Sequence, residues 1–145
     1  SPLMNLDLLR QLSEAPGVPG REERIREILT PHLKKSFDKL DVDPMGNLIA
    51  RKKTKTKNAP KVLIATHIDE IGFYVRYIDD RGFIRIQNVG GFDMRNLFAR
   101  RVRIQTTGGD ELIGLLNPAG RPVHIAKDEE KKKIPEIGEF FVDLG

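Results

Sequence analysis

Apolar residues near the start of the chain recur at helical spacing and predict two helices. The first is short and carries the leucines Leu6, Leu8, Leu9 and Leu12. Proline and glycine residues at 15–20 end it. Between residues 21 and 37, a second apolar stripe predicts an amphipathic helix and consists of Ile25, Ile28, Leu29 and Leu33. Pro31 lies inside this pattern, so we expect it to kink the second helix or to divide it in two.

The rest of the chain carries strand patterns. Residues 40–42 and 48–50 flank a turn and predict a β-hairpin. Residues 61–66 form a continuous apolar run, which is typical of a strand buried on both faces at the centre of an α/β sheet. After Gly72, short strand patterns joined by glycine-containing turns predict a small barrel or sandwich. These patterns lie at 73–78, 83–87, 101–105 and 111–116.

The order of these patterns predicts how the chain is organised. An α/β body comes first and a small β-domain second. Residues 127–133 are a charged linker, and residues 139–145 form one more apolar strand. We expect that last strand to return to the first body.

Composition narrows the chemistry that is open to the chain. The 145 residues include no cysteine, which excludes disulfides, thiolate zinc sites and cysteine nucleophiles. Any metal must therefore be held by His, Asp or Glu, ligands that suit a hydrolytic zinc, cobalt or manganese centre. The net charge of +4 gathers in short basic runs without interleaved aromatic residues, so we expect no nucleic-acid partner. Nothing resembles a signal peptide or a membrane span, so we expect a cytoplasmic protein without a membrane partner.

One polar segment follows directly on the apolar run 61–66. In open α/β sheets, ligands bind at the carboxyl ends of the strands, and His67 lies at that point. A neutral imidazole there is a natural ligand for zinc or cobalt. Asp69 can point to the same side of an extended backbone and steady the ligand. The spacing by itself leaves open whether the pair is a metal site or the ordinary polar end of a strand.

The other candidate groups have structural interpretations. We read His32 as a surface or capping residue near a helix end, and His124 as a structural histidine of the β-domain. Asp79 and Asp80 lie in a hairpin turn, where Asp side chains bond the local backbone. The chain has no G-x-S-x-G sequence, so a serine nucleophile is not expected.

Several segments resemble the peptidase M42 family in the same order. This family comprises glutamyl, deblocking and tetrahedral (TET) aminopeptidases, including relatives that were labelled endoglucanases. The run 61–72 resembles the family's strand followed by H-x-D-E-I-G, with His67 and Asp69 at the corresponding positions. The other segments that resemble the family lie at 13–22, 43–50, 88–91, 121–124 and 140–145.

The resemblance implies a fold and a division of the chain. The fold is α/β, part of a zinc-peptidase-like α/β/α catalytic domain with an inserted small PDZ-like β-barrel domain. Residues 4–70 correspond to the N-terminal part of the catalytic domain. Residues 71–137 correspond to the inserted domain, which mediates dimerisation and assembly in relatives, and residues 138–145 to the strand that returns to the catalytic domain.

The resemblance also implies an activity and its residues. His67 matches the first metal ligand, and Asp69, the candidate catalytic residue, matches the carboxylate that supports it. The complete enzyme removes N-terminal residues from peptides with two divalent ions, zinc or cobalt. The family's other ligands and its general base have no counterpart here, so we expect at most one partial site. We therefore expect an incomplete chain that is inactive alone, with peptide substrates and homo-oligomers from a dimer up to a tetrahedral dodecamer.

Two other functions stay open. The first is an assembly or peptide-binding β-module without catalysis, in which an edge strand pairs with copies of the chain or with unfolded peptide. The second is polysaccharide hydrolysis, suggested by the endoglucanase label of some relatives. It requires two facing carboxylates, and no pair in the sequence argues for them.

Overall fold

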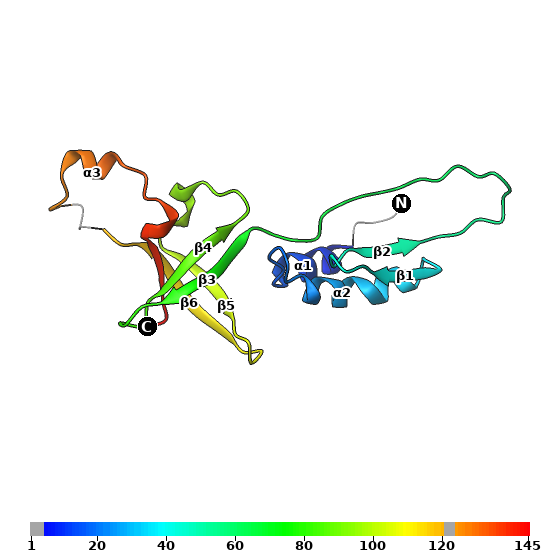
Figure 1. Ribbon diagram of the computed structural model, residues 1–145, viewed down its shortest axis with the longest axis horizontal. Helices are drawn as coiled ribbons and strands as arrows, with labels where there is room; N and C mark the ends of the chain where they lie inside the picture. The colour runs from blue at the N-terminus through cyan, green and yellow to red at the C-terminus, as the bar shows by residue number, and fades with distance from the viewer. Residues whose placement is uncertain (1–4, 121–123) are drawn as a thin grey trace. The chain divides into compact units, whose positions relative to one another are not determined.

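The computed structural model describes residues 5–120 and 124–145 (Figure 1). Residues up to Glu70 form one compact unit, and Ile71–Gly145 form a second. The fold is mixed α/β with a curled sheet. Residue 4, where the expected catalytic part 4–70 begins, lies outside the described residues. The same holds for residues 121–123 of the motif at 121–124. No helix in the described part of the chain has the length and apolar character needed to cross a membrane.

Both predicted helices occur in the first unit. Helix α1 (Leu6–Glu14) begins where the Asn5 side chain accepts a hydrogen bond from the Leu8 amide at 3.0 Å. Helix α2 (Glu23–Lys34) continues through Pro31, so the helix is not divided there. Pro31 lies in the last turn, where the loss of one backbone N–H removes a single bond near the helix end.

The predicted hairpin is confirmed by the antiparallel pairing of β1 (Lys39–Val42) with β2 (Leu48–Arg51). In its turn, the side-chain amide and backbone N–H of Asn47 donate to Asp43, and these bonds hold the pKa of Asp43 below its usual value. The Arg26 guanidinium donates to the Gly46 carbonyl at 3.1 Å and ties this turn to α2.

The second unit is built on one antiparallel sheet. Its strands are β3 (Gly72–Ile78), β4 (Ile84–Val89), β5 (Arg100–Gln105), β6 (Glu111–Pro118) and β7 (Phe140–Asp143), in the spatial order β3-β4-β7-β6-β5. The four predicted short strands are therefore confirmed. Short helical turns η1 (Met94–Leu97), α3 (Asp128–Lys132) and η2 (Ile137–Glu139) complete the unit, with α3 inside the segment expected to be a charged linker.

The core of the second unit lies on one face of this sheet. Its buried members come mostly from the three central strands and are Ile84, Ile86, Leu97, Leu116, Phe140 and Val142. Phe73 on one edge strand and Val102 on the other pack against the same cluster, so the sheet curls around it. The described pairings form one sheet in linear order, not the two sheets of a sandwich.

The last strand lies elsewhere than expected. The segment 138–145 was expected to return to the first unit, but β7 pairs with β4 and with β6 inside the second unit. Val142 stands opposite Ile84 on one side and Leu116 on the other. Phe140 is 0% exposed, and it belongs to the core cluster of the second unit. The expectation is wrong for Phe140–Asp143.

The apolar run 61–66 also differs from its prediction. The structure assigns no strand between Arg51 and Gly72, and Val62, Leu63 and Ile64 are 84%, 88% and 87% exposed. A strand buried on both faces needs neighbours at both edges and an apolar layer on each side. The first unit has a two-stranded sheet, β1–β2, and its described pairings do not include this run.

A strained alanine offers a test of the second unit's geometry. Ala99 has a φ of 51°, held where its amide donates to the Asn117 side chain at 2.9 Å. In the folded state, this conformation costs a non-glycine residue roughly 1–2 kcal/mol, which glycine would relieve. Glycine also gives the unfolded chain more conformational freedom, which lowers the stability of the fold by about 0.4–1 kcal/mol. We therefore expect Ala99→Gly to raise the free energy of unfolding by about 0.5–1 kcal/mol in urea titrations. Ala119→Gly is the control and should lower it; equal effects would contradict the strain.

Candidate functional site

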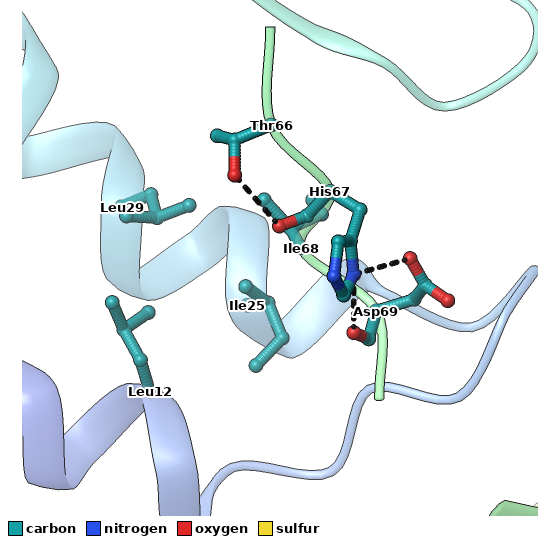
Figure 2. Close-up of a pocket in the computed structure, with 7 residues that line it drawn as sticks. All are labelled: Leu12, Ile25, Leu29, Thr66, His67, Ile68 and Asp69. Atoms are coloured by element: carbon teal, nitrogen blue, oxygen red, sulfur yellow. Dashed lines mark hydrogen bonds and ion pairs between the residues drawn. The ribbon is translucent and has the colours of Figure 1, made fainter. Parts of the chain in front are cut away.

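The segment that contains His67 lies against the two helices of the first unit. Together they surround a pocket of about 310 Å³ (Figure 2). The helices contribute an apolar floor of Leu12 from α1 and of Ile25 and Leu29 from α2. The remaining wall is the segment 66–69, with the imidazole of His67 beside the carboxylate of Asp69. The pocket thus joins an apolar floor to one polar pair.

His67 and Asp69 contact each other directly. The Nδ1 atom of His67 lies 3.2 Å from Asp69 Oδ1 and 3.0 Å from the Asp69 carbonyl oxygen. Both oxygens accept hydrogen bonds, so the neutral ring carries its proton on Nδ1. The lone pair then stands on Nε2, and the side chain is 83% exposed. The arrangement leaves one imidazole nitrogen able to bind a metal.

A backbone hydrogen bond holds this segment to the proline- and glycine-rich turn at 15–20. The Glu70 amide donates to the Gly17 carbonyl at 2.8 Å. A Cβ atom at position 17 would lie 2.6 Å from Ile25 Cγ1, so glycine lets the turn approach α2 closely. The sequence analysis interpreted this turn as a helix breaker and did not predict that it positions the segment of His67. The two glycines of the turn were the sequence feature that could have indicated a close backbone approach.

The site does not gather a full set of metal ligands. Among the described residues, no group of three or more His, Asp or Glu side chains lies close enough to hold an ion. His32 lies in the last turn of α2, and His124 lies exposed in a turn of the second unit. The donor set that fits zinc or cobalt is therefore one imidazole nitrogen with a supporting carboxylate.

Asp79, which leads into the β3–β4 turn, has a local structural role. Asp79 accepts hydrogen bonds from the backbone amides of Phe83 and Arg81 and from the Arg85 guanidinium, at 3.0–3.1 Å. Partial burial acts to raise the pKa of Asp79, but these three donors outweigh it and the pKa is lowered. The expected turn function of Asp79 is confirmed.

Known proteins match nearly the whole chain. Residues 46–145 match the model of a family described as M42 glutamyl aminopeptidase. The lysyl aminopeptidase of Pyrococcus furiosus is 35% identical over an alignment of 146 residues, covering 99% of this chain and 40% of that protein.

Solved structures show the same likeness. The TET aminopeptidase of a Thaumarchaeota archaeon from marine sediment superposes with a TM-score of 0.84 and 31% identity, over 97% of this chain and 38% of that one. The TET1 peptidase of Pyrococcus horikoshii can assemble into a tetrahedron or a large octahedral shell. It superposes with a TM-score of 0.77 and 31% identity, over 97% of this chain and 40% of that one. The chain therefore spans about two fifths of the length of the relatives it matches.

Proposed function

Because this chain belongs to the M42 glutamyl aminopeptidase family, we propose that it contributes a metal ligand, His67, to the active centre of a metal-dependent aminopeptidase. That enzyme removes N-terminal residues from peptides at a centre of two divalent ions, zinc or cobalt. This chain supplies part of the centre and is inactive by itself.

The hydrogen-bonded pair of His67 and Asp69 carries the proposal. The carboxylate of Asp69 holds the Nδ1 side of the ring, at 3.2 Å, and leaves Nε2 for the ion. A carboxylate in this position fixes the tautomer and the orientation of a histidine ligand and raises its basicity. Asp69 therefore acts through His67 as a positioning residue.

The chemistry of the centre requires more than this pair. A zinc or cobalt ion supplies a Lewis acid for peptide hydrolysis. The chain's own contribution is one nitrogen ligand, a carboxylate that orients it, and an apolar pocket floor beside it. A second ion, and a general base to move the proton, require groups that the described residues do not bring to His67.

We also propose the domain assignment of the family. Residues 4–70 are part of a zinc-peptidase-like α/β/α catalytic domain, and residues 71–137 belong to an inserted PDZ-like β-barrel domain. The boundary between the two compact units, after Glu70, supports this division. The strand Phe140–Asp143 stays with the second unit, as its pairing requires. A cytoplasmic location remains a prediction.

A second candidate function is assembly through the second unit. Strand β3 is an edge strand, and its Tyr74, Val75 and Tyr77 side chains are 40–53% exposed. Exposed edges pair readily with other chains. On this view the chain forms a defined homo-oligomer without metal, so light scattering before and after EDTA should give the same mass. A mass that falls with EDTA would favour the metal centre as the organising feature.

The chain alone is expected to lack peptidase activity. One imidazole and one supporting carboxylate cannot hold two ions or move the proton that hydrolysis needs. Release of nitroaniline from aminoacyl-nitroanilides should therefore stay at background with Co²⁺ or Zn²⁺. Activity that depends on Co²⁺ and disappears in His67→Ala would contradict this expectation.

A single-chain chimera tests the proposed function itself. In it, this chain replaces the segment of the P. furiosus lysyl aminopeptidase that it matches, and the rest of that enzyme follows unchanged. We expect a folded chimera that cleaves aminoacyl-nitroanilides when zinc or cobalt is added. A chimera that folds, as judged by circular dichroism and gel filtration, but has no activity would contradict the proposal.

A further inference from the structure

A backbone peptide unit orients the imidazole of His67 together with the Asp69 carboxylate. The Asp69 carbonyl oxygen lies 3.0 Å from Nδ1 of the ring, nearer than the carboxylate oxygen at 3.2 Å (Figure 2). The amide of Glu70 belongs to the same peptide unit, and it donates to the Gly17 carbonyl at 2.8 Å. A peptide unit is planar, so its amide and its carbonyl turn together. Whatever fixes Gly17 therefore also fixes the oxygen that accepts from His67.

The position of Gly17 depends on the turn that leads from it into α2. A hydrogen bond from the Arg21 amide to the Val18 carbonyl, at 2.9 Å, closes this turn. Pro19 and Gly20 are its two central residues, and the φ of Gly20 is 85°, as is typical of a type II turn. The hydrogen bond that closes the turn does not use the Gly20 amide, which therefore needs another acceptor.

The carboxylate of Glu22 is that acceptor. Its Oε1 atom accepts from the Gly20 amide at 2.6 Å, and its Oε2 atom lies 3.4 Å from the Arg26 guanidinium. The side chains of Glu22 and Arg26 are each only 18% exposed. Glu22 is the N-cap residue of α2, but within the described part of the chain its side chain makes no capping hydrogen bond to that helix. The carboxylate thus stabilises the turn and not the helix end.

Arg26 holds the other end of this carboxylate. The guanidinium nitrogen that contacts Glu22 also donates to the Gly46 carbonyl at 3.1 Å, in the turn between β1 and β2. Glu22 is therefore bonded on one side to the turn before α2 and on the other to an arginine that is itself fixed. Hydrogen bonds to a charged group are stronger than those between neutral groups, so we expect this arrangement to hold the turn in one conformation.

We propose that Glu22 is a positioning residue for the ligand His67. Its carboxylate holds the turn before α2, the turn holds the Gly17 carbonyl, and that carbonyl sets the peptide unit that bonds the imidazole. Through these contacts Glu22 determines which ring nitrogen of His67 carries the proton and where Nε2 points. The inference rests on the proposed function only for the statement that Nε2 binds a metal.

Two variants separate the reach of Glu22 from its charge. Glu22→Asp keeps the charge and a favoured N-cap residue, but its side chain is one methylene shorter and withdraws from the Gly20 amide. Glu22→Gln removes the charge but keeps an oxygen acceptor at full reach. Glu23→Asp is the matched control, since the Glu23 side chain is 51% exposed and contacts Arg21.

Amide exchange and ring-nitrogen spectra of the intact chain are the measurements. In Glu22→Asp, the Glu70 amide should exchange at least about tenfold faster, the factor that corresponds to the loss of one hydrogen bond to a charged group. The fraction of His67 rings protonated on Nδ1 should fall. The affinity of Nε2 for Zn²⁺ should fall about three- to tenfold, less than the 10–100-fold typical of a group that contacts a metal ligand directly. Glu22→Gln and Glu23→Asp should stay within about twofold of the original chain.

The inference and the proposed function can fail separately. If Zn²⁺ shifts no signal of His67 in the original chain, the proposed function is contradicted, and the exchange and tautomer results still decide the role of Glu22. Unchanged exchange of the Glu70 amide in Glu22→Asp, or equal effects of Glu22→Asp and Glu22→Gln, would overturn the inference even where His67 binds zinc. Faster exchange at Glu70 with an unchanged tautomer of His67 would overturn it as well.

Discussion

Replacing His67 with alanine in the single-chain chimera is expected to lower kcat/KM by more than about a hundredfold. Loss of a residue that merely supports a metal ligand typically costs 10–100-fold in affinity or activity, and loss of the ligand itself should cost more. Asp69→Ala keeps the imidazole but removes its 3.2 Å contact with the carboxylate. This variant should lower kcat/KM by about 10–100-fold. The measurement is aminoacyl-nitroanilide hydrolysis at saturating Co²⁺.

The control for this series is another histidine of the same unit. His32 lies in the last turn of α2, outside the pocket that His67 lines. His32→Ala should change kcat/KM by no more than a few-fold. If His32→Ala and His67→Ala lowered activity equally, the loss would reflect folding and not metal binding. An Asp69→Ala enzyme with full activity would contradict the role of Asp69 in positioning His67.

The largest stability effect is expected in the second unit, at Phe140. This side chain is fully buried in the core of the unit, on the strand that lies between β4 and β6, and it packs edge-to-face against Phe98. Truncation of a buried phenylalanine to alanine typically costs about 3–5 kcal/mol, through lost burial and the cavity that remains. Because whole domains are stable by only about 5–15 kcal/mol, Phe140→Ala should leave this unit close to unfolding.

Urea unfolding followed by the amide signals of residues 71–145 measures this effect. Leu144→Ala is the control, since Leu144 follows the same strand, is 45% exposed and is not among the core residues. It should change the free energy of unfolding by less than about 1 kcal/mol. Similar losses in the two variants would mean that β7 is not the centre of this sheet.

Local patterns predicted most of the elements, because local spacing determines them. The helices need only a 3.6-residue apolar stripe with caps, and the hairpins need short strands around a turn such as that of Asp43. Helix α3 was not predicted, because its five residues are all polar and show no helical spacing of apolar residues.

Long-range pairing was the part that the sequence could not specify. The segment at Phe140 and the run at Leu63 have similar apolar character, yet one is buried at the centre of a sheet and the other is exposed. The difference lies in the neighbours that each segment finds. Strand β7 meets free edges of β4 and β6, whereas the described first unit pairs no strand with the run at Leu63.

The candidate site was predicted in its residues but not in its setting. We expected His67 at the rim of a sheet, but the described residues 52–71, which include His67, belong to no strand. The segment is held instead by the bond from Glu70 to Gly17 and by the pocket floor. The family assignment therefore rests on the motif order and the comparisons, not on the sheet-rim argument.

Ring nitrogen spectroscopy of His67 tests the central claim most directly. Long-range proton–nitrogen correlation spectra of the intact chain, at a pH where the ring is neutral, distinguish the two tautomers of each histidine. We predict that His67 carries its proton on Nδ1, and that Zn²⁺ shifts the Nε2 signal of His67 before those of His32 and His124. A proton on Nε2, or zinc shifts of equal size at all three histidines, would contradict a metal ligand oriented by Asp69.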